Sequence, residues 1–227
     1  MKDLRYLASK YKFLEYSYLA LKDRFASKGE FTSFFNAIIN NDQKNLFLKT
    51  ASFYLFLVKR GDWLVDVPGS NKKIDYLTDT YKYIALFSLI ESLNNLDFMD
   101  FFAYLIRRKS NVKFPIQNKA ELNQHYKNYK KAFGSIQQSM RFFQSLSRQR
   151  KAMLIQKLKV KNTEPSIENL SKYLYDLRSK FVHEAELIVN MSGRTIVSRK
   201  SICKLSITNL MQFFEEGLVE HFKAETT

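Results

Sequence analysis

Turn-forming residues are scarce in this chain, and this scarcity limits the folds open to it. Six glycines and three prolines are spread over 227 residues, whereas a sandwich or barrel of many short strands needs a turn roughly every 8–12 residues. Hydrophobic residues make up 45% of the chain and aromatic residues 15%, which is enough to fill a core and more than a disordered protein contains. We therefore expect an all-α protein built from long helices.

Apolar residues recur at helical spacing along most of the sequence. The pattern predicts helices over 3–27, 31–39, 46–58, 75–95, 98–108, 119–133, 135–161 with a break near Gln149, 167–183 and 207–222. The stretch 46–58 is apolar on nearly all sides, which is typical of a central core helix. Apolar runs at 187–191 and 195–197 flank a Ser-Gly-Arg turn, so we also expect a short β-hairpin near 187–198.

The sequence Val-Pro-Gly-Ser-Asn at 67–71 is the clearest turn signal in the chain. It separates an N-terminal helical region, residues 1–70, from a helical domain, residues 71–227. The turn is either a boundary between two modules or a surface loop within one composite unit. We treat it as a loop within one unit.

Several classes of protein are excluded by what the sequence lacks. The single cysteine, Cys203, cannot form an internal disulfide, and His125, His183 and His221 are too far apart in sequence for a zinc-binding motif. The longest apolar segment, 51–58, is far below the roughly 18 residues of a membrane span. The N-terminus lacks the basic cap and apolar run of a signal peptide. We expect a cytoplasmic protein that uses no metal and no cofactor.

The positive charge of the chain is concentrated in one segment. The net charge is +15, and residues 101–163, called the basic segment here, contain 15 basic residues and one acidic residue, which gives 15 − 1 = +14. Such a concentration predicts a surface that attracts the phosphates of a nucleic acid. The alternative is a solvated helical surface that keeps the protein soluble. The candidate phosphate contacts are Lys127, Lys130, Lys131, Arg141, Arg148 and Lys151.

One short motif suggests chemistry. The sequence LYDLRSKFVH, residues 174–183, places Arg178 five positions before His183. It resembles the HEPN superfamily, and most closely its Apea-like branch, whose members are helical bundles with an Arg-x(4–6)-His motif and a small polar residue after the arginine. The sequence IALFSLIESL, residues 84–93, is similar to an earlier apolar helix of that family with an acidic residue. By the order of its helices the resemblance covers 72–222. Glu184 departs from the pattern, since a glycine commonly follows the histidine.

The resemblance implies a HEPN-like helical bundle that cleaves RNA without a metal ion. In such a site His183 acts as general base on the ribose 2′-hydroxyl or as general acid at the leaving 5′-oxygen. Arg178 stabilises the charge on the phosphorane oxygens. Ser179 binds the phosphate or orients the histidine, and Glu91 holds Arg178 in position. The basic segment brings RNA to the site.

The spacing of Arg178 and His183 on a helix limits how the two side chains can meet. Residues five apart on a helix are separated by about 140° of rotation and about 7.5 Å of rise, so Arg178 and His183 converge only if the helix ends near Val182 or if a second copy completes the site. Catalytic HEPN proteins are similar in the second respect, because two motifs meet across a dimer interface. A twofold homodimer is the simplest arrangement for one chain.

Other functions remain open at this stage. A catalytic HEPN protein suggests a toxin or phage-defence effector, for which a neutralising antitoxin is a candidate partner. The alternative is a non-catalytic HEPN module that binds RNA, nucleotide or a protein through the basic segment. Arg178 can also form a purely structural ion pair with Asp176, Glu184 or Glu91, while His183 caps a helix end. A helical interaction protein without a nucleic-acid role is the third alternative.

Overall fold

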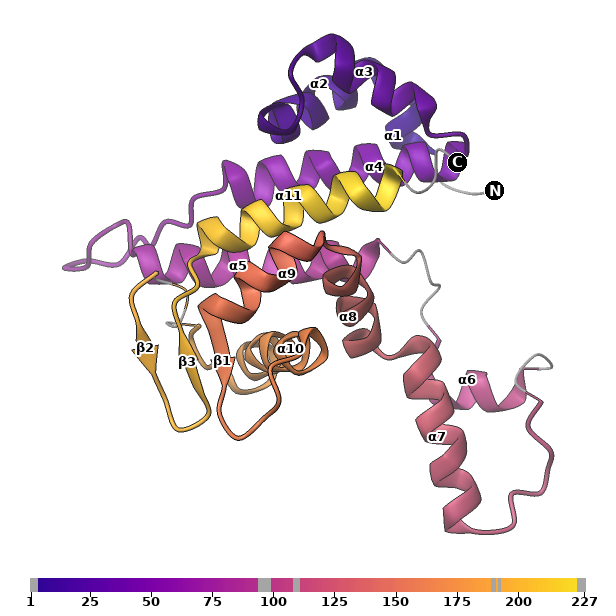
Figure 1. Ribbon diagram of the computed structural model, residues 1–227. Coiled ribbons are helices and arrows are strands. Elements are labelled where there is room, and N and C mark those ends of the chain that lie inside the picture. The colour runs from indigo at the N-terminus through magenta and orange to yellow at the C-terminus, as the bar shows by residue number, and fades with distance from the viewer. Residues whose placement is uncertain (1–3, 94–98, 108–110, 189–190, 192, 224–227) are drawn as a thin grey trace.

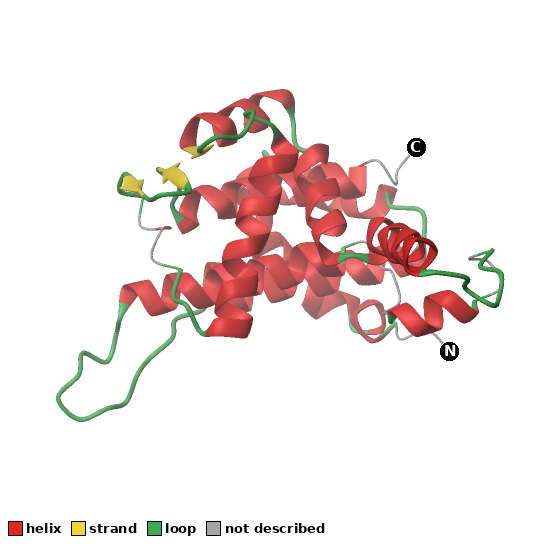
Figure 2. Ribbon diagram, turned by 90° about the horizontal axis from the view of Figure 1, so that it is seen from below, coloured by secondary structure: helices red, strands yellow, loops and turns green. Residues whose placement is uncertain are grey.

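The computed structural model describes residues 4–93, 99–107, 111–188, 191 and 193–223 of the chain (Figure 1). Helices form most of these residues, and three short strands lie at one side of the molecule (Figure 2). The predicted all-α class is therefore confirmed, with a small sheet added. Among the described helices, none has the length and apolar character that a membrane span requires.

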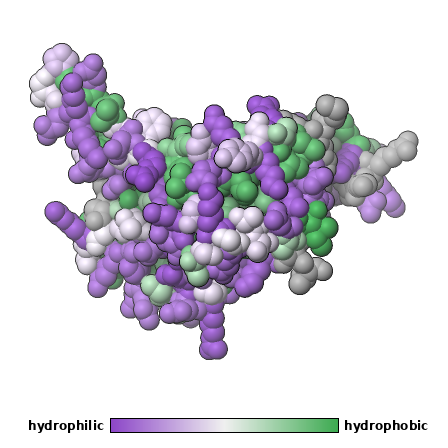
Figure 3. Space-filling model, turned by 90° about the horizontal axis from the view of Figure 1, so that it is seen from above, coloured by the Kyte–Doolittle hydropathy of each residue, from purple (hydrophilic) through white to green (hydrophobic). Residues whose placement is uncertain are grey.

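The N-terminal region folds into short helices that cap the top of the molecule in Figure 1. These elements are α1 (Arg5–Ala8), α2 (Lys10–Leu21), the 3-10 turn η1 (Lys22–Arg24), α3 (Lys28–Ala37), α4 (Asn41–Phe53) and its π-helical continuation η2 (Tyr54–Lys59). The predicted helix 3–27 is divided at Ser9. The helix predicted to begin at residue 46 begins at Asn41, because the Asn40 side chain accepts a hydrogen bond from the Asp42 amide at 2.7 Å. The upper face carries hydrophobic side chains among hydrophilic ones (Figure 3).

The remaining helices agree closely with the periodicity of the sequence. They are α5 (Asp75–Ser92), α6 (Phe101–Ile106), α7 (Lys119–Phe133), α8 (Ser135–Ser145), α9 (Arg148–Lys157), α10 (Ile167–Glu184) and α11 (Ile207–Lys223). The predicted break in 135–161 lies between α8 and α9, where the Ser147 hydroxyl accepts a hydrogen bond from the Arg150 amide at 3.3 Å. The last residues of that predicted helix leave it and form a strand.

Three short antiparallel strands form a sheet in the order β1-β3-β2. They are β1 (Leu158–Val160), β2 (Ile196–Val197) and β3 (Ser201–Cys203). The register pairs Leu158 with Cys203 on one side and Ile196 with Cys203 on the other. The chain thus closes the sheet by pairing residues more than forty positions apart, 158 and 203, which no local pattern predicts.

The prediction of a hairpin near 187–198 was wrong about which strands pair. The hairpin joins β2 to β3, so only its first strand lies within the predicted range. Residues 187–188 are not a strand, because the Ile188 amide donates to the Thr80 hydroxyl of α5 at 3.2 Å instead of to a neighbouring strand. Residues 189, 190 and 192 of the predicted hairpin lie outside the described residues.

A single hydrophobic core connects the two regions on either side of residue 70. Its buried side chains come from α2 to η2 as well as from α5, α8, α10 and α11. The rings of Phe47 and Phe222 lie 5.2 Å apart, and those of Tyr54 and Phe214 lie 4.9 Å apart. Helix α11 runs beside α4 and α5 in Figure 1, so the last helix of the described chain packs against both regions.

A buried carboxylate adds a polar connection between the same regions. Glu215 of α11 is 5% exposed and accepts hydrogen bonds from Tyr54 Oη at 2.7 Å, Arg24 Nε at 2.9 Å and Lys59 Nζ at 3.1 Å. Burial, followed by the nearby Glu215 charge, raises the pKa of Tyr54. The hydrogen bond from Lys59 lowers the pKa of Asp23. Since a buried charge is tolerated only when it is paired, Glu215 fixes η1 and η2 onto α11.

Candidate functional site

Arg178 and Glu91 meet between helices α10 and α5. Arg178 Nη2 lies 3.3 Å from Glu91 Oε2, and both side chains are largely buried. The guanidinium also lies over the ring of Tyr175, 5.8 Å from its centroid. The contact of Arg178 with Glu91 that the sequence suggested is present, whereas the described structure shows no ion pair of Arg178 with Asp176 or Glu184.

This ion pair leaves hydrogen-bonding capacity unused. Burial raises the pKa of Glu91, and the Arg178 charge opposes that rise. Within the described residues, Glu91 Oε1 and Arg178 Nε are buried and have no hydrogen-bond partner. A guanidinium carries five N–H donors in a planar fork, so Arg178 can bind Glu91 and still offer donors to an oxyanion.

His183 lies on the same helix but faces elsewhere. Helix α10 runs without interruption through Glu184 and ends at Ala185, whose φ of 55° is left-handed and whose amide donates to the Phe181 carbonyl at 3.0 Å. The helix therefore does not end near Val182. The exposed His183 makes no hydrogen bond or ion pair with any residue that the structure describes. At about 140° and about 7.5 Å from Arg178, it does not meet Arg178 within one chain.

Aromatic side chains fix the end of α10 that carries His183. Phe181 packs edge-on against Tyr81 of α5 at 5.7 Å, and Tyr81 stacks on Trp63 at 4.3 Å. Ser179 is half-buried beside Arg178. Tyr81, Trp63 and Tyr175 were not among the predicted site residues, although the aromatic spacing around the motif was a usable signal.

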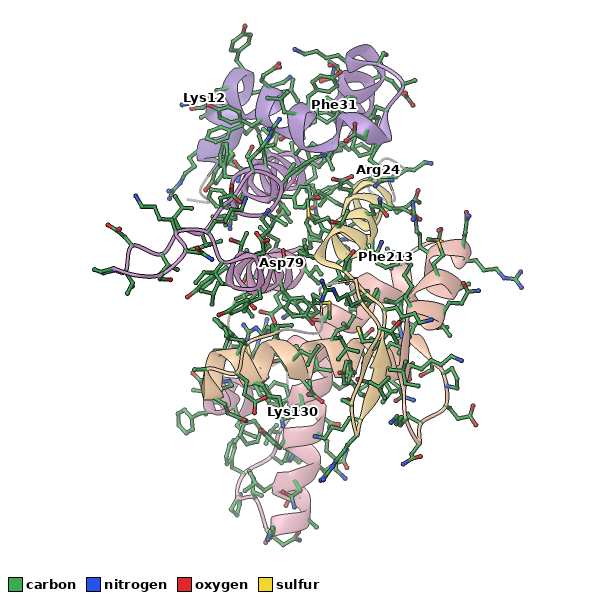
Figure 4. All side chains as sticks on the ribbon, turned by 90° about the vertical axis from the view of Figure 1, so that its left-hand side faces the viewer. Lys12, Arg24, Phe31, Asp79, Lys130 and Phe213 are labelled. Carbon is green, nitrogen blue, oxygen red and sulfur yellow. The ribbon has the colours of Figure 1, made fainter. Side chains whose placement is uncertain are left out.

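The six candidate phosphate contacts fall into two groups. Lys127, Lys130 and Lys131 lie exposed on α7, which projects downward from the body in Figure 1 and in Figure 4, where Lys130 is labelled. None of the three forms an ion pair with a described residue. Lys130 Nζ lies 4.5 Å from the centre of the Tyr126 ring. These three lysines are free to contact an anion.

The second group lies on α8 and α9. Arg141 and Arg148 are exposed, and Arg141 lines a cavity of about 50 Å³ that is far too small for a nucleotide. Lys151 donates to the carbonyl of Gln144 at 3.1 Å, so part of its capacity is spent at the end of α8. The structure thus places the second group on the body and the first on a projection.

Other cations of the basic segment hold the fold together. Arg150 pairs with Glu216 of α11 and lies over the Phe213 ring at 6.0 Å. Lys157 donates to the Asn209 side chain at 2.8 Å. The charge of the basic segment is therefore divided between internal contacts and exposed side chains.

The site contains no evident place for a metal ion within the described part of the chain, where no three His, Cys, Asp or Glu side chains gather. Comparison of the chain with models of protein families, with curated proteins and with solved structures finds no match. What the residues define is a mostly helical protein with a small antiparallel sheet, a largely buried Arg–Glu pair and a projecting basic helix. Its function has to be inferred from these features.

Proposed function

We propose that the protein is a metal-independent endoribonuclease of the HEPN type whose active site is completed by a second copy of the chain. The observation that supports this most directly is the Arg178–Glu91 pair. Glu91 holds the guanidinium between α5 and α10, while buried Nε remains without a described partner. A purely structural ion pair would be expected to satisfy its buried atoms. A phosphate would instead bind those of the five guanidinium N–H donors that Glu91 leaves unused.

The chemistry assigned to each residue follows from its type. The His183 imidazole takes the proton of the ribose 2′-hydroxyl or gives one to the leaving 5′-oxygen, because an imidazole can act as a general base or a general acid. The Arg178 guanidinium stabilises the negative charge that develops on the phosphorane. Ser179, next to Arg178 on α10, contacts the phosphate or orients His183.

The requirement for two copies follows from the continuity of α10. Because Arg178 and His183 point in different directions from one helix, a site that uses both takes Arg178 from one copy and His183 from the other. A twofold arrangement of two α10 helices provides two such sites. The homodimer is part of the proposal.

The first experiment is an RNA cleavage assay in the presence of EDTA. The wild-type protein should cleave RNA, and His183→Ala should lower the rate roughly 10²- to 10⁴-fold, the usual contribution of a general acid or base. Glu184→Ala is the matched control, since Glu184 is exposed at the same end of α10. Absence of cleavage, or equal rates for His183→Ala and Glu184→Ala, would refute the ribonuclease.

A mixing experiment tests the composite site. Arg178→Ala and His183→Ala should each be inactive alone. After exchange of subunits, half of the dimers are mixed and one of their two sites is intact, so about a quarter of the wild-type activity should return. No return of activity would show that each site draws both residues from one chain.

A non-catalytic RNA-binding module is the second candidate, and the three unpaired lysines of α7 favour it. It predicts salt-dependent RNA binding without cleavage. The toxin or phage-defence role, the cytoplasmic location and a neutralising antitoxin partner belong to the first proposal. Expression of the wild-type chain in bacteria should then arrest growth, and expression of His183→Ala should not.

A further inference from the structure

Helices α6 and α7 form a small projection, residues 99–107 and 111–133, which we call the α6–α7 arm. Rings of α6 pack on rings of α7, with centroid distances of 5.1 Å for Phe101–Tyr126, 5.4 Å for Phe101–Tyr129 and 5.9 Å for Tyr104–Phe133. No residue of either helix is fully buried. The two helices are therefore held to each other by aromatic contacts, and both extend away from the body (Figures 1 and 2).

The C-terminal end of the arm joins the body at a tight turn. Gly134 follows α7 directly and α8 begins at the next residue. A β-carbon at Gly134 would collide with the Lys130 carbonyl oxygen, so this turn requires glycine. Helix α8 in turn packs on α10, which carries Arg178. The arm is thus joined to the helix that supports the proposed site.

The described residues of the arm are predominantly basic. They include six basic side chains and two acidic ones. Both acidic side chains accept hydrogen bonds from backbone amides: Asp100 from Ala103 at 2.8 Å and Glu121 from Gln117 at 2.7 Å. The lysines of α7 are left without acidic partners among the described residues. The arm consequently presents uncompensated positive charge to solvent.

The arm also exposes aromatic rings. Phe102 is 71% exposed and Phe114 is 60% exposed, and neither ring contacts another aromatic ring of the described chain. Tyr126 is partly exposed beneath Lys130. Exposed aromatic rings combined with lysines are typical of proteins that bind single-stranded nucleic acids, where bases stack on rings and cations follow the phosphates. A duplex keeps its bases paired and stacked, so they cannot stack on the rings of the arm.

We infer that the α6–α7 arm binds single-stranded RNA, with bases stacked on Phe102 and Phe114 and phosphates neutralised by Lys127, Lys130 and Lys131. That the ligand is RNA rests on the proposed function. The additional content is the preference for a single strand and the residues that create it. The arm binds the strand, and the cleavage site lies elsewhere, on α10.

The test is a fluorescence anisotropy titration of the full chain carrying His183→Ala, which prevents cleavage. The probes are a short labelled single-stranded RNA and a blunt RNA duplex of the same length. Replacing both exposed phenylalanines of the arm by alanine should weaken binding of the single strand roughly tenfold or more and leave duplex binding nearly unchanged. Replacing the three lysines should reduce the slope of log affinity against log salt by about 2 for the single strand.

Matched controls come from the N-terminal region, which lies at the opposite end of the molecule in Figure 4, where Lys12 is labelled. Ile39→Ala removes an apolar side chain that is as exposed as Phe102. The triple variant of Lys10, Lys12 and Lys22 removes three exposed charges. Neither control should change the affinity beyond a general effect of net charge.

Two outcomes overturn the inference. One is an unchanged affinity for single-stranded RNA when both phenylalanines are replaced, and the other is an equal loss of affinity for the duplex. The outcome for the proposed function is separate. If RNA binding depends on the arm but the wild-type chain cleaves no RNA, the ribonuclease proposal is refuted and the RNA-binding role of the arm is supported. If the wild-type chain cleaves RNA but the arm variants bind RNA as tightly as wild type, only the RNA-binding role of the arm is refuted.

Discussion

Removal of the Glu215 carboxylate should destabilise the whole protein. In Glu215→Ala the cations of Arg24 and Lys59, whose side chains are 22% and 21% exposed, lose their buried counter-charge, and the buried hydroxyl of Tyr54 loses its acceptor. Breaking a buried ion pair at one partner costs about 3–5 kcal/mol. Because both cations keep some contact with water, we expect a loss of about 3–4 kcal/mol in the free energy of unfolding. That is a large part of the roughly 5–15 kcal/mol that stabilises a typical protein.

Two milder variants separate the contribution of the Glu215 charge from that of its hydrogen bond with Tyr54. Glu215→Gln keeps an oxygen acceptor for Tyr54 but removes the charge, so its loss should be smaller, about 2 kcal/mol. Tyr54→Phe removes one hydrogen bond to a charged group and leaves both cations paired, so about 1.5 kcal/mol should be lost. The expected order of stability is therefore wild type, Tyr54→Phe, Glu215→Gln and Glu215→Ala.

Urea denaturation followed by far-UV circular dichroism measures these differences. The midpoint should fall while the slope of the unfolding free energy against urea stays constant, since the surface exposed on unfolding is unchanged. Fluorescence of Trp63, the single tryptophan, should report the same transition if residues 1–70 and 71–227 unfold together. Asp62→Ala is the control, because its ion pair with Lys73 is more than half exposed and contributes little. Equal midpoints for Glu215→Ala and Asp62→Ala would refute the reasoning.

Two further predictions concern pH and packing. Burial raises the pKa of Glu91. The stability that the folded protein gains by holding this proton is fully present below the ordinary pKa of 4.5 and is lost as the pH rises through the raised pKa. In urea titrations over that range wild type should therefore lose stability relative to Glu91→Gln, and a difference independent of pH would contradict this. A β-carbon at Gly217 would lie 2.5 Å from Phe142 Cζ, so Gly217→Ala should cost about 1–3 kcal/mol. Gly29→Ala, which has space on α3, should be neutral or stabilising by up to about 1 kcal/mol, and equal melting temperatures for the two glycine variants would refute the packing argument.

Local signals predicted the helices where the chain caps its own ends. Helix α7 has the predicted bounds 119–133, because Asn118 accepts a hydrogen bond from the Glu121 amide at 3.0 Å and Gly134 ends the helix. Helix α4 begins earlier than predicted, since its first turn is polar and carries no apolar periodicity. Its change to a π-helix at Tyr54 has no local signature that we can identify.

Local sequence patterns could not predict the three strands, for a different reason. Residues 158–160 continue an apolar pattern that fits a helix, and they become β1 only because β3 pairs with them from more than forty positions away. Strands of two or three residues are too short for an alternating pattern to stand out. Tertiary contacts therefore decided these segments.

The candidate site was predictable in its parts and not in its assembly. The contact between Glu91 and Arg178 was implied by the family resemblance and not by any pattern of charges in the sequence. The predicted end of α10 at residue 183 lies within one residue of the observed end at Glu184, although the left-handed residue that follows is Ala185 and not a glycine. The direction of His183 depends on that helix end.

The position of α11 has a consequence for synthesis of the protein on the ribosome. The N-terminal helices complete their core with Phe214 and Phe222 and neutralise their cations with Glu215. About 150 residues separate η2 from α11 in the sequence, and a ribosome adds about 5–20 residues each second. The N-terminal helices therefore spend roughly 7–30 s outside the ribosome with an uncovered apolar surface. During that time nascent chains should be bound by chaperones, and folding should begin only after residues 207–223 have emerged.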